Sequence, residues 1–94
     1  MRLIWSPTAE HNLDLIWEYI AQDNLNAADR IRERLHAAAE QLKDYPRMGR
    51  LGRAKDTREL VISGTPYILI YRTSKTEVEI TRVLHGAQEW PPRD

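Results

Sequence analysis

Hydrophobic positions recur at helical spacing in two segments of the first half of the chain. Ser6 followed by Pro7 is typical of a helix start, because serine caps free backbone N–H groups and proline suits the first turn. The first apolar stripe comprises Ala9, Leu13, Ile16, Trp17 and Ile20. Asn26 with Asp29 predicts the cap of a second helix. The second stripe comprises Ala27, Ile31, Leu35, Ala38 and Leu42. The two segments predict an antiparallel helical hairpin that ends at Tyr45-Pro46.

The hydrophobic period changes from helical spacing to alternation after residue 57. Residues 57–62 alternate, residues 63–66 are rich in turn formers, and residues 67–72 form a nearly continuous apolar run. A further alternating segment occupies 77–84, and a short apolar stretch occupies 2–5. We therefore predict an α+β domain: an N-terminal strand, an antiparallel helical hairpin, then a three-stranded antiparallel meander, with the helices packed on one sheet face.

Length and composition narrow the class of protein. The chain has 94 residues, 41% of them hydrophobic and 30% charged, which predicts one globular domain over 1–94. Its longest apolar run, 67–71, is far shorter than the ~20 residues of a membrane-spanning helix. We expect a cytoplasmic protein without a membrane segment. The lack of cysteine excludes disulfides, thiolate catalysis and cysteine-based zinc sites.

The formal net charge is zero, but the charges are distributed unevenly. Residues 1–28 have a net charge of −3, from Arg2 against Glu10, Asp14, Glu18 and Asp23. Residues 43–58 have a net charge of +4, from Lys43, Arg47, Arg50, Arg53, Lys55 and Arg58 against Asp44 and Asp56. Such a basic loop attracts an acidic partner or a phosphate backbone, although a solvated connector is the more common meaning of such a run.

Few residues offer catalytic chemistry. His85, just before Gly86, is the best acid or base candidate, although a lone histidine at a strand end is more often structural. Its strand neighbours are Arg82, Arg58, Tyr71 and Tyr67, and no carboxylate pair accompanies it. His11 and His36 lie on separate helices, so we expect no metal site. Residues 50–53 do not form a phosphate-binding loop.

Two arginines fall on strand faces that the alternation predicts to be apolar. Arg82 shares its predicted face with Val78 and Ile80. Arg58 shares its predicted face with Leu60 and Ile62. A charged group in that position needs a partner. The alternatives are pairing with an acidic residue of the first helix, such as Glu18, and contact with an anion.

A second apolar face is predicted on the first helix. At ~100° per residue, Leu15 and Tyr19 lie together and away from the stripe that contains Leu13 and Ile16. One sheet cannot bury both sets, so we expect a partner to cover Leu15 and Tyr19. The alternative is that Tyr19 packs on the hairpin loop.

Several short motifs, in their order and spacing, together resemble the ParE branch of the RelE/ParE toxin superfamily over nearly the whole chain. They are Trp5-Ser6-Pro7 with Ala9, Tyr19-Ile20-Ala21 with Asp23-Asn24, Ala27-Ala28, Pro46 with Gly49-Arg50 and Gly52, Thr57-Arg58-Glu59-Leu60-Val61, Pro66-Tyr67-Ile68-Leu69-Ile70-Tyr71-Arg72, and Arg82-Val83-Leu84-His85-Gly86-Ala87 with Trp90. The fold that this resemblance implies, a helical hairpin against an antiparallel sheet, agrees with the patterns above.

The resemblance implies the toxin of a type II toxin-antitoxin pair, associated with plasmid stabilisation and neutralised by a ParD-like antitoxin. ParE-type members poison DNA gyrase, whereas RelE-type members cut messenger RNA on the ribosome. It implies no cofactor, and we expect no sequence-specific nucleic-acid binding by the toxin alone. The antitoxin-binding residues that we expect are Leu15, Tyr19, Arg50, Arg53 and Arg58.

The same resemblance helps to decide between gyrase poisoning and RNA cleavage, because the chain departs from the nuclease branch near its last residues. Arg53 and Lys55 occupy the region of the nuclease branch's basic residues. Two positions after Gly86, however, where that branch and many ParE relatives place a basic residue, this chain has Gln88. Trp90 leads into prolines where the nuclease branch places a tyrosine. The resemblance therefore favours gyrase poisoning over RNA cleavage. If the chain is a nuclease, the candidate catalytic residues are His85, Arg82, Arg58 and Tyr71.

Overall fold

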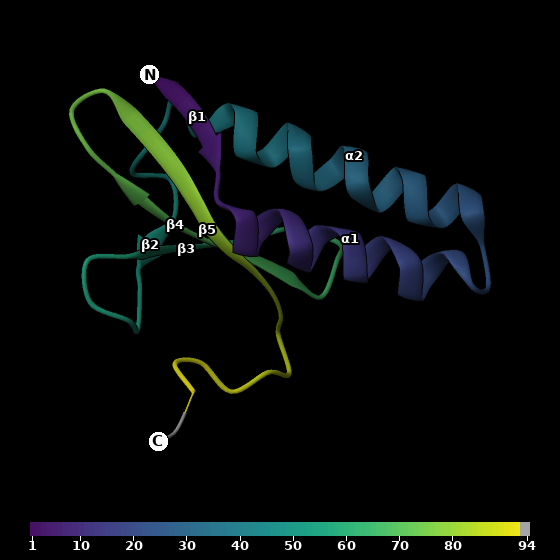
Figure 1. Ribbon diagram of the computed structural model, residues 1–94. Coiled ribbons are helices and arrows are strands. Elements are labelled where there is room, and N and C mark those ends of the chain that lie inside the picture. Colours follow the sequence, from purple (N-terminus) through teal and green to yellow (C-terminus); the bar gives the residue numbers. More distant parts are fainter. Residues whose placement is uncertain (93–94) are drawn as a thin grey trace.

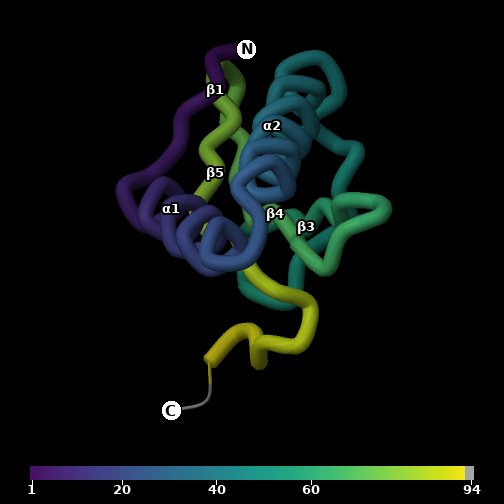
Figure 2. Tube along the Cα trace, turned by 90° about the vertical axis from the view of Figure 1, so that its right-hand side faces the viewer, coloured from purple at the N-terminus to yellow at the C-terminus, as the bar shows by residue number. Residues whose placement is uncertain are grey.

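The computed structural model describes residues 1–92 and has an α+β architecture, in which a helical hairpin covers one face of a five-stranded sheet (Figure 1). In chain order the elements are β1 (Arg2–Trp5), α1 (Pro7–Ala21), α2 (Leu25–Gln41), β2 (Arg50–Leu51), β3 (Arg58–Val61), β4 (Tyr67–Thr73) and β5 (Glu77–His85). Viewed from the α1–α2 turn, the helices lie in front of the strands (Figure 2). This confirms the α+β class.

The helix starts follow from capping side chains. The Ser6 hydroxyl accepts a hydrogen bond from the Ala9 N–H at 3.0 Å, as the sequence predicts. The second cap is Asn24, whose side-chain oxygen accepts from the Ala27 N–H at 3.0 Å. The prediction of a cap at Asn26 was therefore wrong by two residues, because the turn between the helices is shorter than the pattern indicated.

The sheet has the strand order β1-β5-β4-β3-β2 and is mixed. β3, β4 and β5 form the predicted antiparallel meander. Two features differ from the prediction. β1 pairs in parallel with β5 at one edge of the sheet, because the helical hairpin carries the chain across to β2 at the opposite edge and the following strands lead back toward β1. The two-residue strand β2 lies inside the basic loop and pairs with β3, and it is too short to leave a periodic signal.

Most of the core lies between the hairpin and the sheet. The largest fully buried side chains on this face are Leu35, Leu42, Leu69, Tyr71, Val78 and Ile80. The opposite face has a smaller cluster of Ile68, Ile70 and Leu84, against which Trp90 of the C-terminal segment packs.

An irregularity in β5 changes which side chains share a face. Ile70 pairs with Arg82, but its neighbour Tyr71 pairs with Ile80, so Thr81 is an extra residue whose hydroxyl donates to the Ile70 carbonyl at 3.1 Å. The bulge places Arg82 on the face opposite Ile80. The prediction that Arg82 shares a face with Ile80 and Val78 was therefore wrong, because a bulge cannot be recognised from alternation.

Neither helix in the part of the chain that the structure describes is long and apolar enough to cross a membrane.

Candidate functional site

The outer face of α1 carries exposed apolar side chains. Leu15 is 49% exposed and Tyr19 is 73% exposed, so the hairpin loop does not cover Tyr19. Burial, and to a smaller extent the neighbouring Tyr19 phenol, raises the pKa of Tyr67 at the end of the sheet. The Tyr67 ring packs edge-on against His85, with ring centroids 5.8 Å apart. We call Leu15 and Tyr19 the α1 outer face.

Trp17 adds an aromatic group at the seam between the two helices. Its indole N–H donates to an Asp29 carboxylate oxygen at 2.9 Å, and the Arg32 guanidinium lies 4.8 Å from the centre of its ring. The sequence placed Trp17 in the core stripe, whereas the structure places it in contacts with α2, outside the core cluster. Tryptophan, tyrosine and arginine are the residues that dominate binding energy at protein interfaces.

The basic loop is organised around one buried carboxylate. Glu59 has a fully buried side chain that accepts from Arg50 at 3.0 Å and from the Arg53 side chain at 3.1 Å. The Arg53 backbone N–H donates to the same carboxylate at 2.9 Å. Burial alone raises the pKa of Glu59, but the hydrogen bonds from Arg53 and Arg50 outweigh it and lower the pKa to about 2. Two of the predicted antitoxin-binding cations are therefore paired within the chain.

Arg58 and Tyr71 hold the start of this loop. The Arg58 guanidinium donates to the Gly49 carbonyl at 2.8 Å. Within residues 1–92 it forms no ion pair, with Glu18 or with another acid. The Tyr71 hydroxyl accepts from the Gly49 N–H at 2.9 Å and donates to the Pro46 carbonyl at 2.8 Å. A Cβ atom at Gly49 would lie 2.7 Å from that hydroxyl, so only glycine fits here. Burial raises the pKa of Tyr71.

His85 is held by the turn that follows β5. Its Nδ1 accepts a hydrogen bond from the Ala87 N–H at 3.1 Å, and its backbone N–H donates to the Gln88 side chain at 2.7 Å. Because Nδ1 accepts a hydrogen bond, the proton of a neutral ring lies on Nε2.

The four candidate nuclease residues are not brought together. Arg58 pairs with Tyr71 across the sheet, whereas His85 pairs with Tyr67. Tyr67 and Tyr71 are four positions apart along β4, a distance of about 13 Å. Arg82 lies on the other face, with its guanidinium 5.1 Å from the centre of the Trp90 ring.

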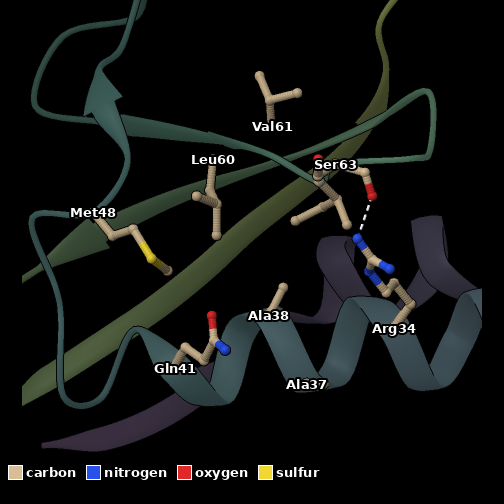
Figure 3. A pocket seen from close by; sticks show the side chains of 9 residues that line it. Arg34, Ala37, Ala38, Gln41, Met48, Leu60, Val61 and Ser63 are labelled. Carbon is tan, nitrogen blue, oxygen red and sulfur yellow. Dashed lines mark hydrogen bonds between the residues drawn. The ribbon is translucent and has the colours of Figure 1, made fainter.

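An apolar groove between α2 and β3 was not predicted from the sequence. It encloses about 330 Å³, and Leu60 points into it while Val61 points away (Figure 3). Arg34 closes one end by donating to the Ser63 carbonyl. Because β2 pairs only with the first half of β3, Val61 lies at a sheet edge and is 55% exposed. The sequence signal that could have indicated this groove is Met48, an apolar residue within the basic loop. In the structure its side chain is 43% exposed.

Within residues 1–92, no group of three or more histidine, aspartate or glutamate side chains is arranged to hold a metal ion.

A sequence profile described as the ParE toxin of the type II toxin-antitoxin system parDE matches residues 3–90. A protein named "Putative toxin Y4kP" from Sinorhizobium fredii is 46% identical over 96% of this chain and 93% of its own length. A protein named "Toxin RelE2" from Caulobacter vibrioides is 38% identical over 93% of this chain and 97% of its own length.

The same fold occurs in a chain from the structure of the chromosomal ParDE TA system of P. aeruginosa, with a TM-score of 0.82. That chain is 22% identical, and the match covers 90% of this chain and 95% of that one. At this identity the likeness concerns the fold alone. Fold and sequence together define a small α+β toxin of the RelE/ParE superfamily. The chain belongs to the family of ParE toxins of type II toxin-antitoxin systems.

Proposed function

We propose that a ParD-like antitoxin neutralises this toxin by covering the α1 outer face, and that the free toxin poisons DNA gyrase. The observation that carries the first part is the exposure of Leu15 and Tyr19 on α1. A helix with an apolar stripe buries such a face, and the matched family is the toxin of a system named after its ParD partner. ParE-type toxins act on gyrase, and membership of this family supports the second part.

The basic loop forms a second part of the proposed antitoxin surface. Arg50 and Arg53 remain 61% and 47% exposed at the side chain although they pair with Glu59, and Arg58 lies beside them. Their charges attract an acidic segment of the partner from a distance, so association slows as salt is added.

The dispersal of the nuclease candidates supports gyrase over messenger RNA as the target. RNA cleavage requires cations preorganised around the phosphorus, and removal of one such donor costs about 3 kcal/mol. Gln88 offers a neutral amide, and its side-chain oxygen already accepts a hydrogen bond from the His85 backbone N–H. Arg58 and Arg82 lie on opposite sheet faces, so they do not surround one phosphate.

Gyrase poisoning is tested with purified toxin, gyrase and supercoiled plasmid. We expect cleaved plasmid to accumulate when the toxin is added, and the antitoxin to abolish this effect. Messenger RNA incubated with ribosomes and the same toxin should remain intact by primer extension. Codon-positioned cuts that disappear in His85→Ala, together with unaffected gyrase, would establish the nuclease function instead.

The antitoxin surface is tested with the double variant Leu15→Glu, Tyr19→Glu. Two carboxylates in place of a buried apolar contact should weaken antitoxin binding at least 100-fold in calorimetry, by about 3 kcal/mol. The matched control is Leu25→Glu, Tyr45→Glu, which changes two residues of the same types that are 61% and 66% exposed. Equal affinity of both variants for the antitoxin, with both folded by circular dichroism, would show that the partner binds elsewhere.

A further inference from the structure

A basic hollow lies beside the loop that joins β2 to β3, where β3 begins and β4 ends. It encloses about 560 Å³ and is lined by the cations Lys55, Arg58 and Arg72, with Asp56 as the one acid. Within residues 1–92, neither Lys55 nor Arg72 forms an ion pair. Outside the hollow, Arg50 and Arg53 share the one negative charge of Glu59.

The frame of this hollow is rigid. The Gly52 N–H donates to the Thr57 carbonyl at 2.8 Å, and the Thr57 hydroxyl donates to the Ala54 carbonyl at 2.7 Å. A Cβ atom on Gly52 would lie 2.2 Å from the Thr57 hydroxyl, which shows how closely the loop is folded on itself. Arg58 is fixed by its bond to Gly49. The loop is thus held by its own hydrogen bonds, and Arg58 is the cation of the hollow that a hydrogen bond to the backbone fixes.

We propose that this hollow binds the phosphodiester backbone of duplex DNA without regard to sequence. The proposal rests on the proposed function, because gyrase holds DNA when it is poisoned. Protein–DNA interfaces are polar and rich in cations, as this hollow is, whereas a protein partner requires apolar anchors. Leu51 is the one large exposed apolar side chain at its rim.

Duplex DNA fits these walls better than a single strand does. Single-strand binders stack bases on exposed aromatic rings, and the one ring that lines the hollow, Tyr71, is fully buried. The negative charge of residues 1–28 lies mainly on α1. The loop between β2 and β3, which lines the hollow, lies at the opposite end of the molecule from the α1–α2 turn (Figure 1). DNA is therefore attracted to the basic end, in spite of the zero net charge of the whole chain.

The test measures binding of a fluorescent duplex of about 20 base pairs to the purified toxin at salt concentrations from about 50 to about 200 mM. In this range the release of counterions from DNA makes the affinity fall measurably as salt is added. Three phosphate contacts predict a slope of log K against log salt of about −2.7. The variant Lys55→Ala, Arg72→Ala should reduce the slope to about −0.9. The control Arg2→Ala, Arg30→Ala removes the same charge at exposed positions outside the hollow and should keep the wild-type slope.

Equal slopes for the two variants would overturn the proposal, as would tighter binding of a polyglutamate peptide than of DNA, which would mean an acidic protein partner. The gyrase cleavage assay on the same variants distinguishes the two proposals. A toxin that binds DNA through the hollow but leaves gyrase untouched supports the hollow and rejects gyrase poisoning. A toxin that poisons gyrase but does not measurably bind DNA supports gyrase poisoning and rejects the hollow as a DNA-binding site.

Discussion

At the scale of single residues, the buried carboxylate of Glu59 determines how much of the loop's positive charge is available. Counted along the sequence, Arg50 and Arg53 are free cations. In the fold both converge on Glu59. The sequence could not reveal this because β2, which brings Arg50 opposite Glu59, has only two residues. Within residues 1–92, Lys55 and Arg72 are among the cations without an ion pair, and a charge count along the sequence does not distinguish them from Arg50 and Arg53.

Glu59 makes stability depend on pH. Its pKa is lowered from 4.5 to about 2 in the folded protein, so its contribution is fully present above pH 4.5 and is lost as the pH falls toward 2. The shift corresponds to roughly 2–3 kcal/mol. Urea unfolding of Glu59→Gln should therefore show a loss of this order at pH 7 and a much smaller loss near pH 2. A loss that is the same at both pH values would show that the ion cluster does not stabilise the fold.

At the scale of elements, hydrophobic period predicted the two helices and the meander because each is long enough to show its repeat. β1 is also visible in the pattern, but its parallel pairing with β5 is a property of the crossover and has no local signal. The bulge at Thr81 reverses the face of Arg82, and strict alternation cannot show it. Of the predicted site, Leu15 and Tyr19 are exposed as helical geometry requires, whereas Arg58 and Tyr71 have structural partners.

Ser6 links the start of α1 to β5. Its hydroxyl accepts from the Ala9 N–H and donates to the Thr81 carbonyl at 3.1 Å. Ser6→Ala should lower the free energy of unfolding by about 1–2 kcal/mol, since it removes the helix cap. The control is Thr8→Ala, an exposed residue of the same helix, for which we expect a change within about 0.5 kcal/mol. Similar midpoints for the two variants in urea unfolding would show that the cap is not needed.

At the scale of the whole molecule, the fold separates two surfaces of different chemistry. The α1 outer face is apolar and belongs to an acidic helix, whereas the basic hollow lies beyond β3. The sequence already indicated this asymmetry, because acidic residues precede and basic residues follow the second helix. The fold adds that Arg58 belongs both to the basic part of the proposed antitoxin surface and to the hollow, so an antitoxin bound there would compete with DNA for this residue.

The central claim is that this toxin stops growth by acting on DNA gyrase. The most direct measurement is induction of the chain in bacteria without its antitoxin, with DNA-damage signalling and protein synthesis followed in the same culture. We predict that the damage response rises first while amino-acid incorporation continues. An immediate arrest of translation without a damage response would contradict this account and favour the ribosome as the target.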